Sequence, residues 1–209
     1  MEEKVLKTGT TTVGLVTKEG IILGTDKRAT AGYLIVDKKA QKLHKITDTI
    51  ALTIAGSVSD AQKIISLVKA EIKFQSLRIL RPLTATEVAY FLSNIVYQKI
   101  REFSTIESVA HFILAGLDNG TFSLYDIFPD GSVTKIDDFV SSGSGSVFAY
   151  GVLETNYDKN LTIEEGKKLV VKAINAALQR DIASGNGIEL LVVDKNGVNF
   201  VDVSSIKLN

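Results

Sequence analysis

Residues 10–26 read TTTVGLVTKEGIILGTD, and this stretch decides the fold class. Two runs of β-branched and apolar residues, 11–17 and 20–25, flank the turn sequence Lys18-Glu19-Gly20, which is typical of a tight hairpin between two strands. Strands joined by a turn this short must run antiparallel. The folded part of the chain is therefore predicted to begin as an antiparallel sheet.

Strand patterns continue on the C-terminal side of this hairpin and alternate with helical ones. The further strand-like segments are 33–36, 41–46, 49–55, 110–117, 121–128, a strand pair within 131–142, 187–194 and 197–203. The helical segments are 61–72 (with Ser57 or Ser59 as a cap), 84–96, 145–156 and one that starts at Thr162. Two helices begin with a capping box, Thr84 with Glu87 and Thr162 with Glu165.

This order of elements predicts an α/β (α+β) protein of one domain. Strands joined by short turns form antiparallel sheets, and each amphipathic helix must cover one face of a sheet. Two such halves can stack sheet on sheet with their helices outside. No linker, low-complexity tract or internal repeat divides the 209 residues.

Composition excludes several classes of function. Lys plus Arg and Asp plus Glu both total 24, so no broad positive field favours nucleic acid or a membrane surface. No apolar run reaches the length of a membrane span, and the acidic N-terminus does not resemble a secretory signal. Cysteine is absent, which excludes disulfides and a Cys nucleophile, and a cytoplasmic location is expected.

The chain has two histidines, His44 and His111, each inside a strand-like apolar segment. No neighbouring signature supports a histidine-based catalytic triad. We expect a buried, hydrogen-bonded core role for both. A hydrolase built on this sequence would find its general base elsewhere.

Three separated residues could form a reactive group at one end of the first sheet. Thr10 follows Gly9 at the start of the first strand, Asp26 ends the second strand, and Lys42 lies in an alternating segment. Antiparallel pairing can bring all three together. Taken singly, each has an ordinary structural interpretation: a β-branched strand start, a turn acid and a solvated strand charge.

Five motifs together resemble proteasome β subunits over essentially the whole chain. They are Thr10-Thr-Thr-Val-Gly14, Gly24-Thr-Asp-Lys-Arg-Ala-Thr30, Lys42 with Thr53-Ile-Ala-Gly-Ser-Val-Ser-Asp60, Ser142-Gly-Ser-Gly-Ser-Val-Phe-Ala-Tyr-Gly151 and Gln179-Arg-Asp-Ile-Ala-Ser-Gly185. The short leader of nine residues is more similar to that of archaeal subunits than to that of eukaryotic ones.

The resemblance implies the N-terminal-nucleophile (Ntn) hydrolase fold, a four-layer α/β/β/α sandwich. It implies a propeptide, residues 1–9, removed by cleavage between Gly9 and Thr10, and a peptidase domain, residues 10–209. Thr10 would then be the nucleophile of a threonine endopeptidase, with Asp26 and Lys42 beside it. Gly56 would supply an oxyanion-hole amide, and a polar network around the Thr10 amine and hydroxyl would comprise Ser144, Asp181 and Ser184.

The resemblance also implies how substrate and partners bind. An extended chain would lie between Thr30 and segment 56–58, and the primary specificity pocket would be lined by Ala29, Ala40, His44, Ile54 and Val58. Most of these residues are apolar, so cleavage after hydrophobic residues is expected. The implied partners are other β subunits in a heptameric ring, α-subunit rings, ring ATPase regulators acting indirectly, and unfolded proteins as substrates. No metal or other cofactor is implied.

Other interpretations stay open at this point. The segment Ser142-Gly-Ser-Gly-Ser146 before a helix could cradle a phosphate, although it lacks the Gly-Lys-Ser/Thr of a P-loop. The subunit could also remain unprocessed and serve only as a scaffold in the ring. A related bacterial ring peptidase shares the N-terminal threonine and the lysine, but the motifs around Ser144 and Asp181 favour the proteasome branch.

Overall fold

The computed structural model describes residues 9–103 and 110–206, so the expected leader residues 1–8 lie outside the described part. Within those ranges the chain forms two five-stranded sheets and one two-stranded hairpin. The first sheet has the order β10 (Phe139–Ser142), β1 (Thr12–Thr17), β2 (Gly20–Asp26), β11 (Ile188–Asp194), β12 (Gly197–Val201). The second has the order β5 (Leu43–Lys45), β6 (Ile50–Gly56), β7 (Ala110–Asp118), β8 (Thr121–Ile127), β9 (Val133–Ile136).

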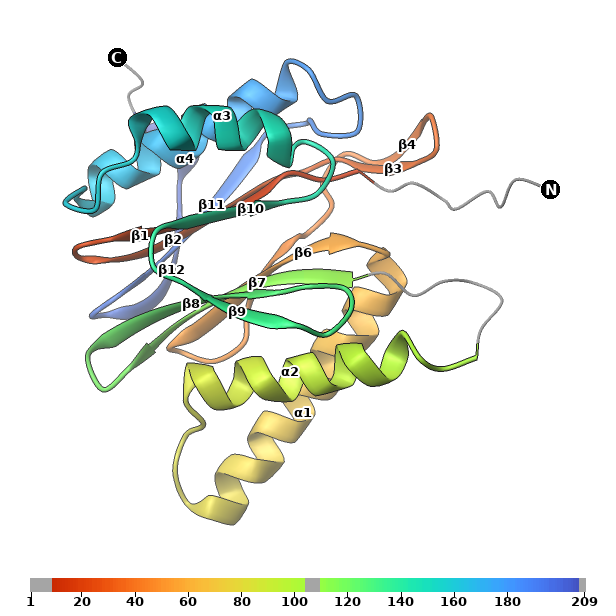
Figure 1. Ribbon diagram of the computed structural model, residues 1–209, viewed down its shortest axis with the longest axis vertical. Helices are drawn as coiled ribbons and strands as arrows, with labels where there is room; N and C mark the ends of the chain where they lie inside the picture. The colour runs from red at the N-terminus through yellow and green to blue at the C-terminus, as the bar shows by residue number, and fades with distance from the viewer. Residues whose placement is uncertain (1–8, 104–109, 207–209) are drawn as a thin grey trace.

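The two sheets stack face to face and helices cover both outer faces, as Figure 1 shows. Helices α3 (Ser146–Asn156) and α4 (Ile163–Leu178) cover the first sheet. Helices α1 (Val58–Ile79) and α2 (Ala85–Lys99) cover the second. The predicted four-layer α/β/β/α sandwich of antiparallel sheets is therefore confirmed.

Three apolar layers hold this arrangement together. One lies between α1, α2 and the second sheet, and another lies between α3, α4 and the first sheet. The third fills the space between the sheets and includes Leu23, Ile113 and Leu191, all without solvent exposure. Successive strand residues point to opposite faces, so each inner strand supplies both a helix-facing and a sheet-facing layer. This explains why β2 is buried along its whole length.

The predicted capping boxes form at the starts of α2 and α4. At α1 the cap position is Ser57, but its side chain makes no capping hydrogen bond to the helix. The predicted strand pair within 131–142 is wrong in one respect, because β9 pairs with β8 and β10 pairs with β1. The chain therefore crosses from one sheet to the other between these strands. No helix among the described residues is long and apolar enough to cross a bilayer.

The sequence predicted only one strand of a short hairpin. Residues Ala29–Ala31 form β3, which pairs with β4 (Leu34–Asp37) outside both main sheets. Only the second of these strands follows from the apolar run at 33–36. The hairpin extends from the end of the sandwich at which the chain enters β1 (Figure 1).

Candidate functional site

The predicted reactive residues gather at the end of the sandwich where β1 begins and β2 and β6 end. Thr10 lies two residues before β1, and Asp26 is the last residue of β2. The register of β1 with β2 pairs Thr12 with Thr25, which places Thr10 and Asp26 at the same edge. Lys42 precedes β5 and is held to β6 because its carbonyl accepts a hydrogen bond from the Ile54 amide at 3.0 Å.

Lys42 and Asp26 form a buried ion pair. Lys42 Nζ donates to Asp26 Oδ1 at 2.7 Å, and the two side chains are 5% and 0% exposed. Burial lowers the pKa of Lys42 below its ordinary value, and the Asp26 carboxylate is the strongest influence in the opposite direction. A buried ammonium with a depressed pKa next to a carboxylate is typical of a functional site.

The Asp26 carboxylate is also tied to the backbone on both sides. Its Oδ1 accepts from the Thr11 amide at 3.0 Å, and its Oδ2 accepts from the amides of Arg28 and Gly185 at 3.0 and 2.9 Å. With Lys42, these donors use all four lone-pair sites of a carboxylate. Asp26 therefore fixes the positions of three chain segments around the ammonium group of Lys42.

Thr10 itself is 4% exposed and hydrogen-bonded through its side chain and backbone. Its hydroxyl donates to the carbonyl oxygen of Gly9 at 2.7 Å, so the hydroxyl lies next to the peptide bond predicted to be cleaved. Its amide donates to Ser144 Oγ at 3.3 Å, and its carbonyl accepts from the Gly145 amide at 3.3 Å. Gly143, at φ +90°, lies so close to Thr10 that an added Cβ would be 2.1 Å from the Thr10 carbonyl oxygen.

The three predicted network residues form one hydrogen-bonded group. Asp181 Oδ2 accepts from Ser144 Oγ and from Ser184 Oγ, both at 2.6 Å. Ser144 then contacts the Thr10 amide, whereas the Ser184 hydroxyl bonds to Thr11 Oγ at 2.7 Å. The network therefore reaches Thr10 through Ser144, and it reaches the neighbouring threonine through Ser184.

A cavity of about 240 Å³ opens beside Thr10 and joins the reactive residues to the predicted specificity pocket. Its walls include Lys42, Gly56 and the five predicted pocket residues Ala29, Ala40, His44, Ile54 and Val58. Thr30 does not line this cavity, but its Oγ accepts from the Gly9 amide at 3.1 Å. Gly56 has φ +105°, a left-handed conformation that glycine adopts without steric cost.

Several residues at this site were not predicted. Thr11 binds both Asp26 and Ser184, and Arg28 donates to Asn186 Oδ1 and to the Ile182 carbonyl. Both residues lie inside motifs quoted above, so position within the motif was the available signal. The cavity has five further lining residues, Val36, Asp37, Gln41, Ala55 and Gln62.

We predicted a buried, hydrogen-bonded core role for both histidines; the hydrogen bond is confirmed for His111, which is only partly buried, and the prediction is wrong in part for His44. His111 Nε2 bonds to Asp126 Oδ1 at 2.6 Å, and its ring packs against Phe128. His44 lines the cavity, and its Nε2 is buried without a hydrogen-bond partner among the described residues. Burial lowers the pKa of His44, the charge of Lys69 adds to this, and a hydrogen bond with the Gln41 backbone opposes it.

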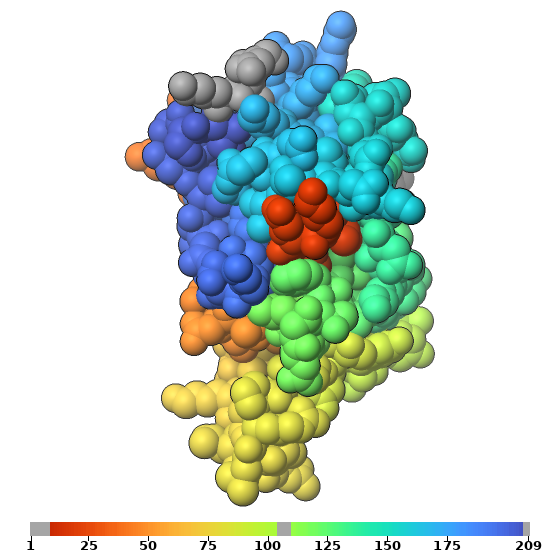
Figure 2. Space-filling model, turned by 90° about the vertical axis from the view of Figure 1, so that its left-hand side faces the viewer, coloured from red at the N-terminus to blue at the C-terminus, as the bar shows by residue number. Residues whose placement is uncertain are grey.

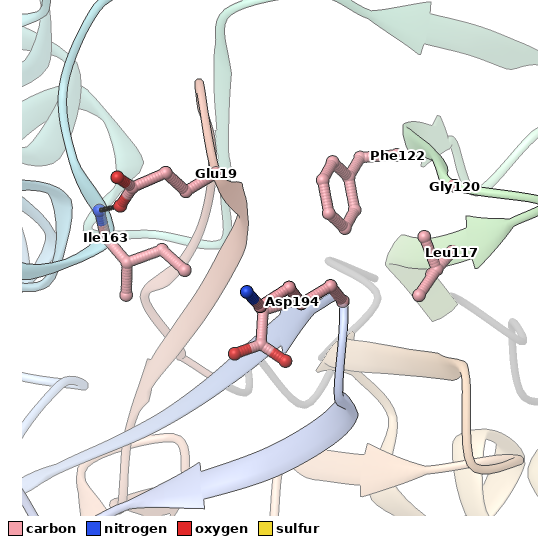
Figure 3. A pocket seen from close by; sticks show the side chains of 7 residues that line it. Glu19, Leu117, Gly120, Phe122, Ile163 and Asp194 are labelled. Atoms are coloured by element: carbon pink, nitrogen blue, oxygen red, sulfur yellow. Dashed lines mark hydrogen bonds between the residues drawn. The ribbon is translucent and has the colours of Figure 1, made fainter.

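A larger cavity, about 520 Å³, lies at the opposite end of the sandwich (Figure 3). Its lining includes residues of the β1–β2, β7–β8 and β11–β12 turns, and Figure 2 shows the surface at this end. Glu19 Oε2 accepts from the Ile163 amide at 3.0 Å, so its carboxylate stabilises the start of α4. No nucleophile with an adjacent base is present among its lining residues, which favours the smaller cavity as the candidate site.

Comparison with known proteins identifies a matching family model and similar chains. A family model described as "Proteasome subunit" matches residues 6–193. The chain is 45% identical over 201 residues to "Proteasome subunit beta" of Methanococcus maripaludis strain C7, covering 95% of this chain and 90% of the relative. It is 44% identical over 201 residues to "Proteasome subunit beta" of Methanocaldococcus jannaschii, covering 95% and 88%.

Proposed function

The chain belongs to the proteasome subunit family, and we propose that it is a catalytic β subunit of an archaeal 20S core, acting as a threonine endopeptidase. The nucleophile is the hydroxyl of Thr10. The observation that carries the proposal is that Thr10 and the buried Lys42–Asp26 pair lie at one cavity, with the Thr10 hydroxyl 2.7 Å from the Gly9 carbonyl oxygen.

The first step of this proposal is removal of the propeptide, residues 1–9, to leave the peptidase domain, residues 10–209. Thr10 Oγ adds to the Gly9 carbonyl carbon and gives a tetrahedral adduct, in which the Thr10 nitrogen is an amine and no longer an amide. This nitrogen takes up the hydroxyl proton as the C–N bond breaks, which leaves an ester. Water then hydrolyses the ester, which frees the leader as an acid and Thr10 as an N-terminal residue. The short Thr10 Oγ to Gly9 oxygen distance supports an intramolecular reaction, because the reacting groups are already in contact.

Cleavage also creates the general base. Within the precursor the Thr10 nitrogen is an amide and cannot accept a proton, whereas a free α-amine has an ordinary pKa of about 7.7–8.0. It can therefore take the hydroxyl proton near neutral pH, as in other hydroxyl–amine pairs. Ser144 already contacts this nitrogen and is held by Asp181, so it is placed to orient the new amine.

Lys42 and Gly56 act on the charges that develop during peptide hydrolysis. The ammonium group of Lys42 favours alkoxide character at Thr10 Oγ, and Asp26 keeps that group in place. The Gly56 amide would donate to the oxyanion of the tetrahedral intermediate, an interaction whose loss typically costs about 3–4 kcal/mol. An ester on Thr10 follows, and water releases the peptide.

The substrate in this proposal is an extended, unfolded polypeptide. Such a chain can bind as an added strand between Thr30 and the segment at 56–58, since main-chain hydrogen bonds tolerate most sequences. The apolar side chains Ala29, Ile54 and Val58 line the adjacent cavity and favour a hydrophobic residue before the cleaved bond. The partners are β subunits in a heptameric ring, α-subunit rings and, indirectly, ring ATPases in the cytoplasm.

The test compares Thr10→Ala with Thr10→Ser in assembled particles. Peptidase activity should vanish in Thr10→Ala and persist in Thr10→Ser, which keeps a hydroxyl and an amine. Intact-mass analysis should find the wild-type chain beginning at Thr10. A full-length chain in a mature, otherwise active particle would mean that this subunit is an inactive scaffold, the alternative within the same ring.

A further inference from the structure

Gly9, the residue before the bond expected to be cleaved, is held at several of its atoms. Its amide donates to Thr30 Oγ at 3.1 Å, and its carbonyl oxygen accepts from the Thr10 hydroxyl at 2.7 Å. Its α-carbon lies against Ala183, so closely that an added Cβ would be 1.8 Å from Ala183 Cβ. The nitrogen, the α-carbon and the oxygen of Gly9 are therefore each in contact with another residue.

The contact at the nitrogen comes from a buried side chain of β3. Thr30 is 4% exposed, and its hydrogen bond with Gly9 is buried. Successive strand residues point to opposite faces, so Ala29 lines the cavity beside Thr10 whereas Thr30 does not. A buried amide without an acceptor is costly, and Thr30 Oγ is the acceptor that the described part of the chain provides for this one. The Thr30 hydroxyl therefore anchors the Gly9 nitrogen.

The position of the Gly9 nitrogen decides how the Gly9 carbonyl faces the nucleophile. Two soft dihedral angles separate these groups, and glycine has more freedom in both angles than any other residue. Without an anchor at the nitrogen, the carbonyl carbon would therefore adopt many orientations relative to Thr10 Oγ. Intramolecular attack is fast only when the reacting atoms are held about 3–3.5 Å apart and aligned. A hydrogen bond that restricts both angles should therefore speed the attack.

We propose that Thr30 is a positioning residue for release of the leader: its side-chain hydroxyl holds the Gly9 amide, and thereby keeps the Gly9 carbonyl in reach of Thr10 Oγ. This inference rests on the proposed self-cleavage and adds a residue to it. The chemical step is the one given above, in which Thr10 Oγ bonds to the Gly9 carbonyl carbon and the C–N bond breaks. The main-chain contact of Thr30 with an extended substrate is a separate role, because it does not use the hydroxyl.

The test separates the hydroxyl of Thr30 from its bulk. Thr30→Val keeps the branched shape but has no acceptor, whereas Thr30→Ser keeps the acceptor and loses a methyl group. Assembled particles are sampled over time and the fraction of chains that begin at Thr10 is measured by intact mass. Thr30→Val should release the leader at least about tenfold more slowly than the wild type, and Thr30→Ala, which also lacks the hydroxyl, should be similarly slow. Thr30→Ser should stay close to the wild-type rate. Slower release in Thr30→Ser than in Thr30→Val would assign the effect to packing and overturn the proposal.

Thr17→Val is the matched control for the loss of a buried hydroxyl. Thr17 is also 4% exposed, and its Oγ also accepts from a backbone amide, that of Glu19. Thr17 ends β1 at the far end from the leader, so this variant should release the leader at the wild-type rate even where its unfolding midpoint falls. Equal release rates in wild type and Thr30→Val, or an equal slowing in Thr17→Val, would overturn the role of the Thr30 hydroxyl alone. Wild-type particles that assemble but keep the leader would instead contradict the proposed self-cleavage, and the role of Thr30 with it.

Discussion

Replacing Asp26 by asparagine is the sharpest test of how the site is held together. The Asp26 carboxylate is fully buried and accepts four hydrogen bonds, one from the Lys42 ammonium and three from backbone amides. Asparagine has nearly the same shape, so no cavity forms. However, its amide NH₂ must face either the Lys42 and Thr11 donors or the Arg28 and Gly185 donors, and donors cannot pair with donors.

The size of the effect follows from this loss. Removing one partner of a buried ion pair costs about 3–5 kcal/mol, because the other charge remains buried without compensation. For a chain of this length, each kcal/mol moves the thermal midpoint by roughly 2–4 °C, so the midpoint should fall by roughly 6–20 °C. The change also removes the strongest influence that supports the charged form of Lys42, so the pKa of Lys42 should fall further.

The assay is thermal unfolding of the purified, unassembled chain, followed by circular dichroism. Asp48→Asn is the matched control, because Asp48 also pairs with a lysine at 2.7 Å but its side chain is 96% exposed. The control should change the midpoint little, since exposed ion pairs contribute little to stability. Equal midpoints for Asp26→Asn and Asp48→Asn would refute the claim that the buried carboxylate holds these segments together.

Two further changes test the leader and the capping of α2. Gly9→Ala should slow release of the leader in an intact-mass time course, because the added Cβ would lie 1.8 Å from Ala183 Cβ. Adding Ala183→Gly removes that clash and should restore part of the rate. An unchanged rate in the single variant Gly9→Ala would contradict the expected clash. Glu87 has a pKa lowered from 4.5 to about 2, first by its hydrogen bond with Arg81, so its stabilising effect is complete above pH 4.5 and is lost toward pH 2. The difference in unfolding midpoint between wild type and Glu87→Gln should therefore narrow over that range, and a pH-independent difference would exclude this linkage.

Much of the fold follows from the sequence because local signals agree with each other. The hairpin around Lys18-Glu19-Gly20 and the capping boxes at Thr84 and Thr162 each depend on neighbouring residues, and all three appear where they are predicted. The separation of β9 from β10 could not be predicted, since both strands have similar patterns and their partners are distant in sequence. Which distant strands pair with each other is decided by how the sheets pack, and local sequence patterns do not indicate it.

The candidate site, like the fold, could be predicted from the sequence only in part. Position within the motifs indicated that Thr10, Asp26 and Lys42 would meet, and the structure places Asp26 and Lys42 in direct contact and Thr10 at the same cavity. The sequence could not indicate which hydroxyl bonds to which, so the contact between Ser184 and Thr11 was unexpected. Likewise, the sequence does not indicate that the buried Nε2 of His44 lacks a hydrogen-bond partner among the described residues.

The most direct test of the central claim is to trap the nucleophile in assembled, active particles. A peptide epoxyketone can be captured by an amine and a hydroxyl on neighbouring carbons, which only an N-terminal threonine or serine offers at once. Digestion and mass spectrometry should then find one adduct on a peptide that begins at Thr10, bonded through both its nitrogen and Oγ, with loss of activity in proportion. Particles that hydrolyse peptides while Thr10 is still joined to Gly9 would contradict the account.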